Sequence, residues 1–395
     1  MVIEEYTEEI VSIAKRENNT KRAYLVVNRL QGKHIPVEPS KPMGMFHALA
    51  QKVKAAYQGQ ALLAVGFAET ATAIGAAVAA ELGIPYIQTT REAVPGVEYL
   101  YFSEAHSHAA EQKLMKDDLD QMIGGIGRIV FIEDEVTTGN TILNIIGLLR
   151  NHYGNQIRFS VASLLNGMDE EAMGRYLAQQ IDALYLVKTD HSHYGKVAGQ
   201  SAGDGVYHKP SKVQGRGDGA ACPSGRGLCQ ADAGQLQEIR IPGAQNARRM
   251  VQGAAYQAAC QALWEKVQEA VPFEAAQDVL VLGTEEFMYP PLFVAHQLQL
   301  LGHKVKCHAT TRSPIAVSKE KDYPLHERYE LASLYDVSRV TYVYDLAQYS
   351  LVLILTDAPC QESREGSISA GLVSLQDALC SCGNQNIYCI RWCEA

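Results

Sequence analysis

Short apolar runs alternate with amphipathic stretches along the first half of the chain. "AYLVVN" (23–28) and "ALLAVGF" (61–67) each contain four or more apolar residues in succession, which predicts buried strands. The same pattern predicts further strands at 83–88, 128–134, 157–165 and 181–188. "MGMFHALAQKVKAAY" (43–57) repeats apolar residues at helical spacing, and an alanine-rich helix is predicted to end near residue 82. Buried strands that alternate with helices predict an α/β fold with a mostly parallel sheet covered on both faces.

The pattern breaks at residues 197–245 and then resumes. This stretch is crowded with Gly, Ser, Ala and charged residues, which predicts a linker or a long surface loop. Beyond it the pattern predicts helices at 247–271 and near 290–301, with strands at 278–283, 303–309, 350–356 and 386–392. The sequence therefore predicts a domain at 1–196, a linker at 197–245, and a second, Rossmann-like α/β domain at 246–395.

Composition and charge narrow the classes of function. The 47% of apolar residues can supply a core for each domain, and no apolar run reaches the length of a membrane span. The N-terminus lacks the basic start and apolar stretch of a signal peptide. A net charge of −9 argues against a nucleic-acid partner that is held through its phosphates. The 9 cysteines lie between Cys222 and Cys393, and their odd number predicts free thiols in a cytoplasmic protein.

The segment "RIVFIEDEVTTGNT" (128–141) gathers acidic residues at the end of a predicted buried strand. Such carboxylates repel one another unless a cation or hydroxyl groups lie beside them. The turn rich in glycine and threonine lets backbone N–H groups converge at a helix start, where a phosphate binds. Glu133 and Asp134 can accept hydrogen bonds from vicinal hydroxyls and help to hold a divalent cation. Phosphate, diol and metal together describe a ribose 5-phosphate.

Two other interpretations of this segment stay open. One is an acidic turn that is merely solvated. The other is a Walker B strand, which would need a G-x-x-x-x-G-K-[ST] partner, and the chain contains none.

"VFIEDEVTTGNT" closely resembles the motif with which type I phosphoribosyltransferases bind phosphoribosyl pyrophosphate (PRPP). In that family the two acids hold the ribose 2′- and 3′-hydroxyls, and the turn holds the 5′-phosphate. The resemblance implies that Glu133 and Asp134 are the catalytic acids at the ribose. It assigns the 5′-phosphate to Thr137, Thr138, Gly139, Asn140 and Thr141.

Further segments resemble the same family. "AVGFAETATAIG" (64–75) resembles the pyrophosphate loop, in which the backbone N–H groups would come from Ala68, Glu69, Thr70 and Ala71. The alternative is an ordinary strand–helix turn capped by Glu69 or Thr70. Residues 88–114 correspond to the flexible hood that closes over the substrate, and Arg91 stands where orotate-type relatives place a pyrophosphate-binding arginine.

Several histidines and their neighbours are candidate contacts within the hood or with the base. His106 and His108 are general acids, substrate contacts or solvated side chains, and their H-x-H spacing lacks the further ligands of a metal site. Residues 18–42 resemble the base-side segment of orotate-like relatives, where Lys33 and His34 either face the site or form a surface turn. "KTDHSHYGK" (188–196) follows a strand end and supplies the candidate base contacts Asp190, His191 and His193.

The second domain carries its own motif in "KCHATTRSPI" (306–315). Thr-Arg-Ser-Pro matches the motif of the TRSP domain, which follows phosphoribosyltransferases in gene sets linked to tellurium resistance and stress response. Thr311, Arg312 and Ser313 form a candidate anion site, and the alternative is a salt bridge from Arg312 to Glu285 or Glu286. Buried thiols, rather than a zinc site, are predicted for Cys380, Cys382, Cys389 and Cys393.

The resemblance implies an enzyme of the orotate-like branch. It would move 5-phosphoribosyl from PRPP to a nitrogenous base with release of pyrophosphate. Mg²⁺ would be the cofactor, held mainly through PRPP, and the family commonly forms homodimers. The alternatives are a non-catalytic regulator that binds PRPP or a nucleotide, and a phosphorolysis-like cleavage in the reverse direction. Neither a membrane nor a nucleic acid is an expected partner.

Overall fold

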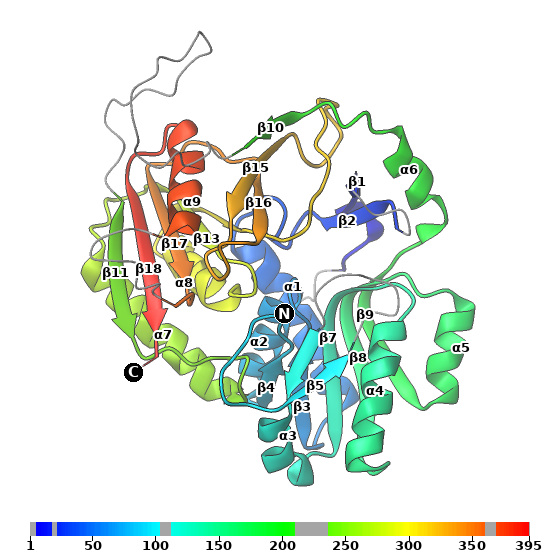
Figure 1. Cartoon of the computed structure of the whole chain (residues 1–395). Helices are drawn as coiled ribbons and strands as arrows, with labels where there is room; N and C mark the ends of the chain where they lie inside the picture. The colour runs from blue at the N-terminus through cyan, green and yellow to red at the C-terminus, as the bar shows by residue number, and fades with distance from the viewer. Residues whose placement is uncertain (1–4, 18–21, 103–111, 210–235, 360–368, 395) are drawn as a thin grey trace.

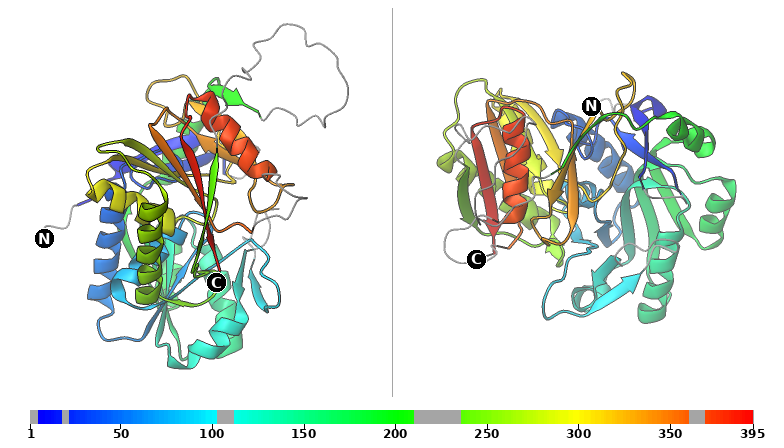
Figure 2. Two further views of the ribbon diagram at one scale, coloured as in Figure 1. Left: turned by 90° about the vertical axis from the view of Figure 1, so that its left-hand side faces the viewer. Right: turned by 45° about the horizontal axis from the view of Figure 1, so that its top comes forward.

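The computed structural model describes residues 5–17, 22–102, 112–209, 236–359 and 369–394 (Figure 1). Two parallel sheets organise the chain. We call the part built on the six-stranded sheet the first domain and the part built on the five-stranded sheet the second domain. In the right-hand view of Figure 2, the second sheet with its red strand β18 stands on the left, and the green strands of the first sheet stand on the right.

The first sheet has the order β12-β4-β3-β7-β8-β9 and is parallel except for β12, which pairs antiparallel with β4. Its strands are β3 (Leu62–Gly66), β4 (Pro85–Gln88), β7 (Arg128–Val136), β8 (Arg158–Asn166), β9 (Ile181–Lys188) and β12 (Val251–Gln252). Its helices are α1 (Ser40–Ala56), α2 (Thr72–Leu82), α4 (Asn140–Tyr153) and α5 (Glu170–Ala178). The predicted parallel sheet is confirmed, and the strand predicted at 128–134 runs two residues further.

The second sheet is parallel throughout, in the order β11-β18-β17-β13-β14. Its strands are β11 (Gln237–Pro242), β13 (Asp278–Gly283), β14 (Lys304–Ala309), β17 (Leu351–Thr356) and β18 (Ile387–Cys393). Its helices are α7 (Gly253–Ala270), α8 (Tyr289–Leu300) and α9 (Ala370–Ser381). A three-stranded sheet lies beside it, made of β10 (Val206–His208), β15 (Glu327–Ala332) and β16 (Val340–Tyr344).

Several small elements escaped the pattern analysis. They are β1 (Val11–Lys15), β2 (Tyr24–Asn28), β5 (Tyr99–Phe102), β6 (Gln112–Met115), α3 (Lys116–Met122), α6 (Tyr194–Gln200) and the 3₁₀ turns Glu8–Ile10, Ile123–Gly125 and His191–His193. β2 is the exception, because it confirms the strand predicted at 23–28, and the others were not predicted. β10, β11 and most of α6 fall inside the predicted linker. β10 has only 3 residues and β11 is largely exposed, so neither shows an apolar run.

Helix α2 joins the two domains. It is buried on every side, as expected for a helix of small apolar residues. It packs against α1 in the first domain and against α7 and α8 in the second. The backbones approach so closely that a Cβ at Gly253 would lie 2.1 Å from the carbonyl oxygen of Ala79. One hydrophobic core therefore runs through both domains.

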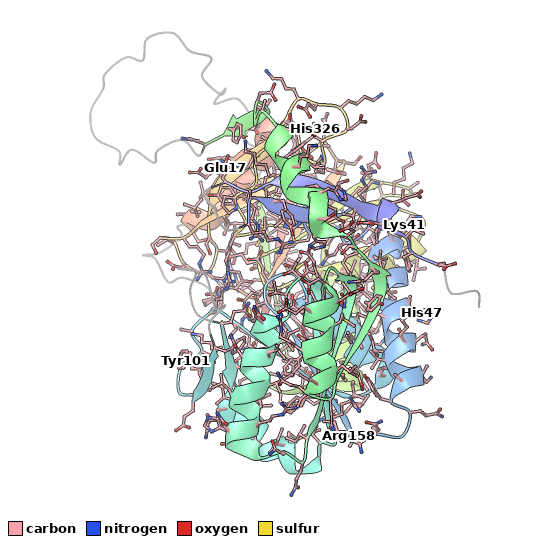
Figure 3. All side chains as sticks on the ribbon, turned by 90° about the vertical axis from the view of Figure 1, so that its right-hand side faces the viewer. Glu17, Lys41, His47, Tyr101, Arg158 and His326 are labelled. Carbon is pink, nitrogen blue, oxygen red and sulfur yellow. The ribbon has the colours of Figure 1, made fainter. Side chains whose placement is uncertain are left out.

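The carboxyl ends of the strands of both sheets meet between the domains. Arg158, at the amino end of β8, lies at the bottom of Figure 3, while Glu17 and His326 lie toward the top, so the first sheet points upward into the molecule. Glu69, after β3, contacts Arg312, after β14, and Thr90, after β4, contacts Glu286, after β13. Ligands of parallel sheets bind at such carboxyl edges.

Within the ranges given above, no helix is long and apolar enough to cross a membrane.

Candidate functional site

The acidic motif forms the end of β7 and the turn into α4. Glu133 and Glu135 lie opposite Ser163 and Leu165 of β8. Gly139 adopts a φ of 69° and directly precedes α4. Its carbonyl oxygen accepts a hydrogen bond of 2.8 Å from the Tyr176 hydroxyl on α5. The turn is thereby fixed against α5, and its backbone leads into a helix N-terminus that favours an anion.

Burial and a neighbouring carboxylate change the acidity of Asp134. Desolvation and the charge of Glu135 together raise the pKa of Asp134 to about 6. Glu135 instead binds the guanidinium of Arg22 through both carboxylate oxygens, at 2.6 and 2.7 Å. The end of β7 therefore presents one carboxylate that is paired and one that a cation or hydroxyl donors would stabilise.

A cluster beside Glu135 combines an expected residue with two that the sequence analysis missed. His191 lies 3.5 Å from Glu135, and its Nδ1 is 3.0 Å from the hydroxyl of Tyr24. Arg22 lies just before β2, and Tyr24 is the first residue of β2. Burial lowers the pKa of His191, which favours the neutral ring. The only sequence signal for Arg22 and Tyr24 was their place in the segment that resembles the base side.

The other two candidate base contacts, Asp190 and His193, contact residues of their own segment and not the acidic motif. Asp190 is exposed, and its carboxylate accepts hydrogen bonds from the backbone and hydroxyl of Ser192, which caps the 3₁₀ turn. His193 makes an edge contact with the ring of Tyr194. Of the three candidate base contacts, the structure brings His191 next to the acidic motif.

The loop after β3 presents part of its backbone to the carboxyl edge. The N–H of Ala68 donates to the Thr89 hydroxyl at 2.8 Å, and the N–H of Ala71 donates to the carbonyl of Phe67 at 3.0 Å. These two groups are thus engaged, which leaves Glu69 and Thr70 as the candidate pyrophosphate donors. The Ala68–Glu69 peptide bond is cis.

The side chain of Glu69 turns toward the second domain. It pairs with Lys33 at 2.6 Å and with Arg312 at 3.2 Å. Burial alone would raise the pKa of Glu69, but the two cations outweigh it and lower the pKa to about 2. Glu69 is therefore an ionised anchor of the loop.

Lys33 and His34 lie between the domains, so the surface-turn alternative is wrong. Lys33 is 1% exposed and also donates to the backbone carbonyls of Glu285 and Thr310. Burial, with a further contribution from Lys33, lowers the pKa of His34 to about 3. Residues 33 and 34 are buried because residues far along the chain, such as Glu285 and Thr310, cover them.

Arg91 follows β4, and its backbone N–H donates to the Glu286 carboxylate at 2.9 Å. The hood region contains the antiparallel pair β5–β6, so part of it is ordered sheet. His106 and His108 lie outside the described residues.

The geometry around Arg312 favours the salt-bridge alternative. Its guanidinium meets Glu285 at 2.8 Å and Glu286 at 2.9 Å, and it meets two carboxylates of the first domain, Glu92 at 2.8 Å and Glu69 at 3.2 Å. Thr311 accepts a hydrogen bond from the backbone of Ser313 at 3.2 Å. An external anion at Arg312 would have to displace these carboxylates.

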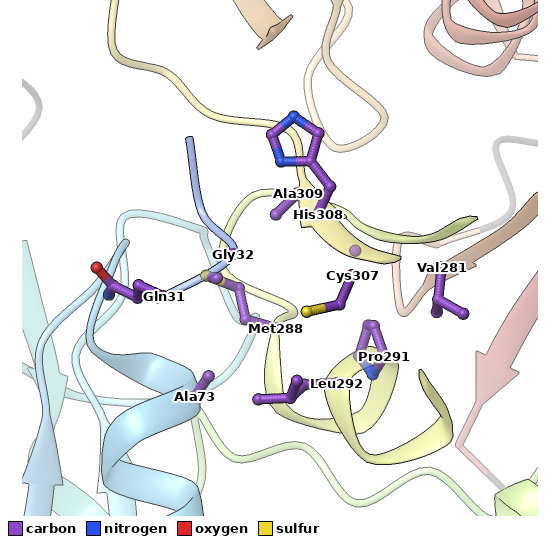
Figure 4. Close-up of a pocket in the computed structure, with 11 residues that line it drawn as sticks. Gln31, Gly32, Ala73, Val281, Met288, Pro291, Leu292, Cys307, His308 and Ala309 are labelled. Atoms are coloured by element: carbon purple, nitrogen blue, oxygen red, sulfur yellow. The ribbon is translucent and has the colours of Figure 1, made fainter. Parts of the chain in front are cut away.

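Two small cavities lie at the domain interface. One, of about 20 Å³, is lined mainly by apolar atoms together with Gln31, Cys307 and His308 (Figure 4). The other, of about 10 Å³, lies beside Arg248 and Glu286. Each has room for about one water molecule and cannot hold a nucleobase.

The described part of the chain contains no group of three or more His, Cys, Asp or Glu residues that could hold a metal ion. Cys389 is buried in β18, as predicted, while Cys380, Cys382 and Cys393 are half-buried, and all four are free thiols.

Comparison with known proteins gives the two parts separate matches. Residues 10–191 match the family model described as "Phosphoribosyl transferase", and residues 246–374 match the one described as "TRSP domain C terminus to PRTase_2". The chain combines a phosphoribosyltransferase domain with a TRSP domain. The α/β fold class and the family expectation are thereby confirmed.

Solved structures similar to the phosphoribosyltransferase domain include adenine phosphoribosyltransferases. The enzyme from Rhodothermus marinus is 14% identical, over 46% of this chain and 96% of that chain, with a TM-score of 0.35. The enzyme from Trypanosoma brucei, solved with AMP, pyrophosphate and ribose-5-phosphate, is 18% identical, over 46% and 77%, with a TM-score of 0.33. No curated protein matches the chain.

Proposed function

We propose that this protein transfers the 5-phosphoribosyl group of PRPP to a nitrogenous base and releases pyrophosphate. The observation that carries the proposal is the acid pair Glu133–Asp134 at the end of β7, followed by the Gly139 turn at the start of α4. It occurs inside the segment that matches the phosphoribosyltransferase family. The reaction builds positive charge at the ribose C1, so catalysis depends on positioning and on stabilising charge.

Each part of the carboxyl edge has a role in this reaction. Glu133 and Asp134 accept hydrogen bonds from the ribose hydroxyls, and the turn at 137–141 holds the 5′-phosphate. The backbone of Glu69 and Thr70, together with Arg91, holds the departing pyrophosphate. His191, which lies beside Glu135, is the candidate contact to the base.

We propose that Mg²⁺ enters with PRPP. The carboxylate of Asp134 fits this role, because its raised pKa marks a half-buried acid whose ionised form a nearby cation would stabilise. When bound, Mg²⁺ neutralises charge on the pyrophosphate. Since no group of three ligand residues occurs in the described ranges, oxygen atoms of PRPP and water would supply most of its coordination.

The test replaces both acids by their amides. Glu133→Gln with Asp134→Asn removes the charges and keeps the side-chain shapes, so PRPP-dependent pyrophosphate release should be abolished while the fold persists. The matched control changes an exposed glutamate and an exposed aspartate of the second domain, Glu320→Gln with Asp322→Asn. Turnover in the acid-pair variant equal to that of the control refutes the ribose assignment.

A PRPP-binding regulator is the second candidate function, and phosphorus NMR separates the two. A transferase converts PRPP when its acceptor is present, whereas a regulator binds PRPP and leaves it intact. The domain limits 1–196, 197–245 and 246–395, the orotate-like relation, the setting in tellurium resistance or stress response, the cytoplasmic location and the homodimer stay predictions.

A further inference from the structure

The second domain contacts both segments of the first domain that are proposed to hold pyrophosphate, and we call these two segments, the loop after β3 and the residues after β4, the pyrophosphate elements. The loop after β3 reaches it through Glu69, and the residues after β4 reach it through Thr90, Arg91 and Glu92. These contacts join the carboxyl edges of the two sheets, where substrates of parallel sheets bind.

Arg312 holds the first of these elements at several points. Its Nε lies 3.2 Å from a carboxylate oxygen of Glu69, and its backbone N–H donates to the other oxygen at 3.3 Å. Lys33, itself held by carbonyls of the second domain, pairs with the same carboxylate at 2.6 Å. Because the Glu69 side chain is pinned in this way, the direction of its backbone N–H depends on the second domain.

Glu286 holds the second element. Its carboxylate accepts from the Thr90 hydroxyl at 2.7 Å and from the Arg91 backbone N–H at 2.9 Å. Its backbone carbonyl accepts from the hydroxyl of Thr72, the first residue of α2, at 2.9 Å. Glu286 thus fixes both the position of Arg91 and the helix that follows the pyrophosphate loop.

The charges around Arg312 make it central to this arrangement. Four carboxylates surround its guanidinium, and its side chain is only 12% exposed. Loss of one partner in such a buried set leaves uncompensated charge, which the structure relieves by moving the groups concerned. Without Arg312, Arg339 would still pair with Glu92 at 2.5 Å and with Glu285 at 2.8 Å. Glu69 would keep only Lys33 as an ion-pair partner, so we expect the loop that carries Glu69 to move most.

We propose that Arg312 and Glu286 of the TRSP domain are positioning residues for the pyrophosphate of PRPP, acting through Glu69 and the backbone of Arg91. The inference rests on the proposed function and extends it. The TRSP domain is then part of the transferase site and not an independent neighbour.

The test compares Arg312→Ala with the loss of another ion pair. Arg249, whose side chain is half-exposed, binds Asp118 of α3 at 2.7 Å, so Arg249→Ala is the control. Glu69→Gln, which removes the charge and keeps the side-chain shape, gives a second and milder variant. All are made in the full chain.

Two readouts are measured on each folded variant. The first is the KM for PRPP against kcat, together with the Kd for PRPP with Mg²⁺. A misplacement of about 1 Å can lower the rate on the order of 100-fold, so we expect kcat/KM for PRPP to fall about 10- to 100-fold in Arg312→Ala, mainly through a higher KM. Arg312→Lys, which keeps the charge but not the fork of donors, should restore part of the loss. The second readout is hydrogen exchange of residues 66–73, which should accelerate in Arg312→Ala and Glu69→Gln and stay at the wild-type rate in Arg249→Ala.

The two readouts separate the two claims. Exchange of residues 66–73 that does not change in either variant overturns the positioning role, whatever the protein binds. A KM for PRPP that rises equally in Arg249→Ala overturns it as well. Wild-type protein that binds no PRPP refutes the proposed function instead, and the exchange rates then decide whether Arg312 positions the loop.

Discussion

Alanine at Gly139 should disturb the phosphate-binding turn in two ways. Gly139 has a φ of 69° and a ψ of 4°, a left-handed conformation that alanine adopts only with strain. A Cβ at this position would also lie 2.4 Å from the hydroxyl oxygen of Tyr176 and 2.5 Å from its Cε2. Tyr176 is buried and hydrogen-bonded to the carbonyl of Gly139, so it cannot simply swing aside.

The structure allows these two costs to be separated. The left-handed backbone costs about 1–2 kcal/mol for a residue with a Cβ. Overpacking a buried site adds about 1–3 kcal/mol. Gly83, at the end of α2, has nearly the same conformation, with a φ of 65° and a ψ of 26°, but a Cβ there meets nothing within 4 Å. Gly83→Ala should therefore lower the free energy of unfolding by the first amount only, and Gly139→Ala by the sum of both.

Urea unfolding of the two variants measures the difference, with the Kd for PRPP measured alongside. Gly139→Ala should weaken PRPP binding, while Gly83→Ala should not. Adding Tyr176→Ala to Gly139→Ala removes the clash, so the two changes together should cost less than the sum of the single changes. Equal losses of stability in Gly139→Ala and Gly83→Ala would refute the packing argument.

Three further predictions concern groups whose pKa is shifted by burial. The pKa of Asp134, raised to about 6, predicts that the affinity for PRPP falls as the pH drops through 6, because the protonated acid accepts fewer hydrogen bonds. An affinity for PRPP that does not change between pH 8 and pH 5 contradicts this. Burial lowers the pKa of His308 from 6.5 to about 4, so the folded state binds fewer protons than the unfolded state between these values. His308 should therefore contribute about 3 kcal/mol to the fall in the free energy of unfolding as the pH drops from 6.5 to 4, beside the contribution of His34, and His308→Gln, compared by urea unfolding, should reduce the fall by that amount. Burial raises the pKa of the Cys307 and Cys389 thiols to about 12, so a thiol reagent should modify them only on unfolding, and rapid reaction of both in the native protein contradicts their burial.

The sequence predicted what local patterns encode. The strand that ends in Glu133 and Asp134 and the helix after Gly139 follow from an apolar run, a turn and a helix start, all within 14 consecutive positions of the printed sequence. Strands β3, β13 and β17 are continuous apolar runs, because parallel strands are covered on both faces.

The contacts that complete the site have no local signature. Arg22 and Glu135 are 113 positions apart, and Arg312 and Glu69 are 243 apart. Lys33 and His34 could be read either as site contacts or as a surface turn before Pro36, and the contacts that bury Lys33 come from residues far away in the sequence. The edge strand β11 is mostly exposed, because it has a neighbouring strand on one side only, so it contains no apolar run that could have predicted it.

Phosphorus NMR of the full chain with PRPP and Mg²⁺, with and without a small-molecule cell extract, tests whether the protein transfers the phosphoribosyl group. The proposed function predicts that pyrophosphate appears when the extract supplies the acceptor, and that the Glu133→Gln, Asp134→Asn protein produces none. Fractionating the extract would then identify the base. PRPP that stays intact in every extract, with signals that the protein neither shifts nor broadens, would show that the protein is not a phosphoribosyltransferase.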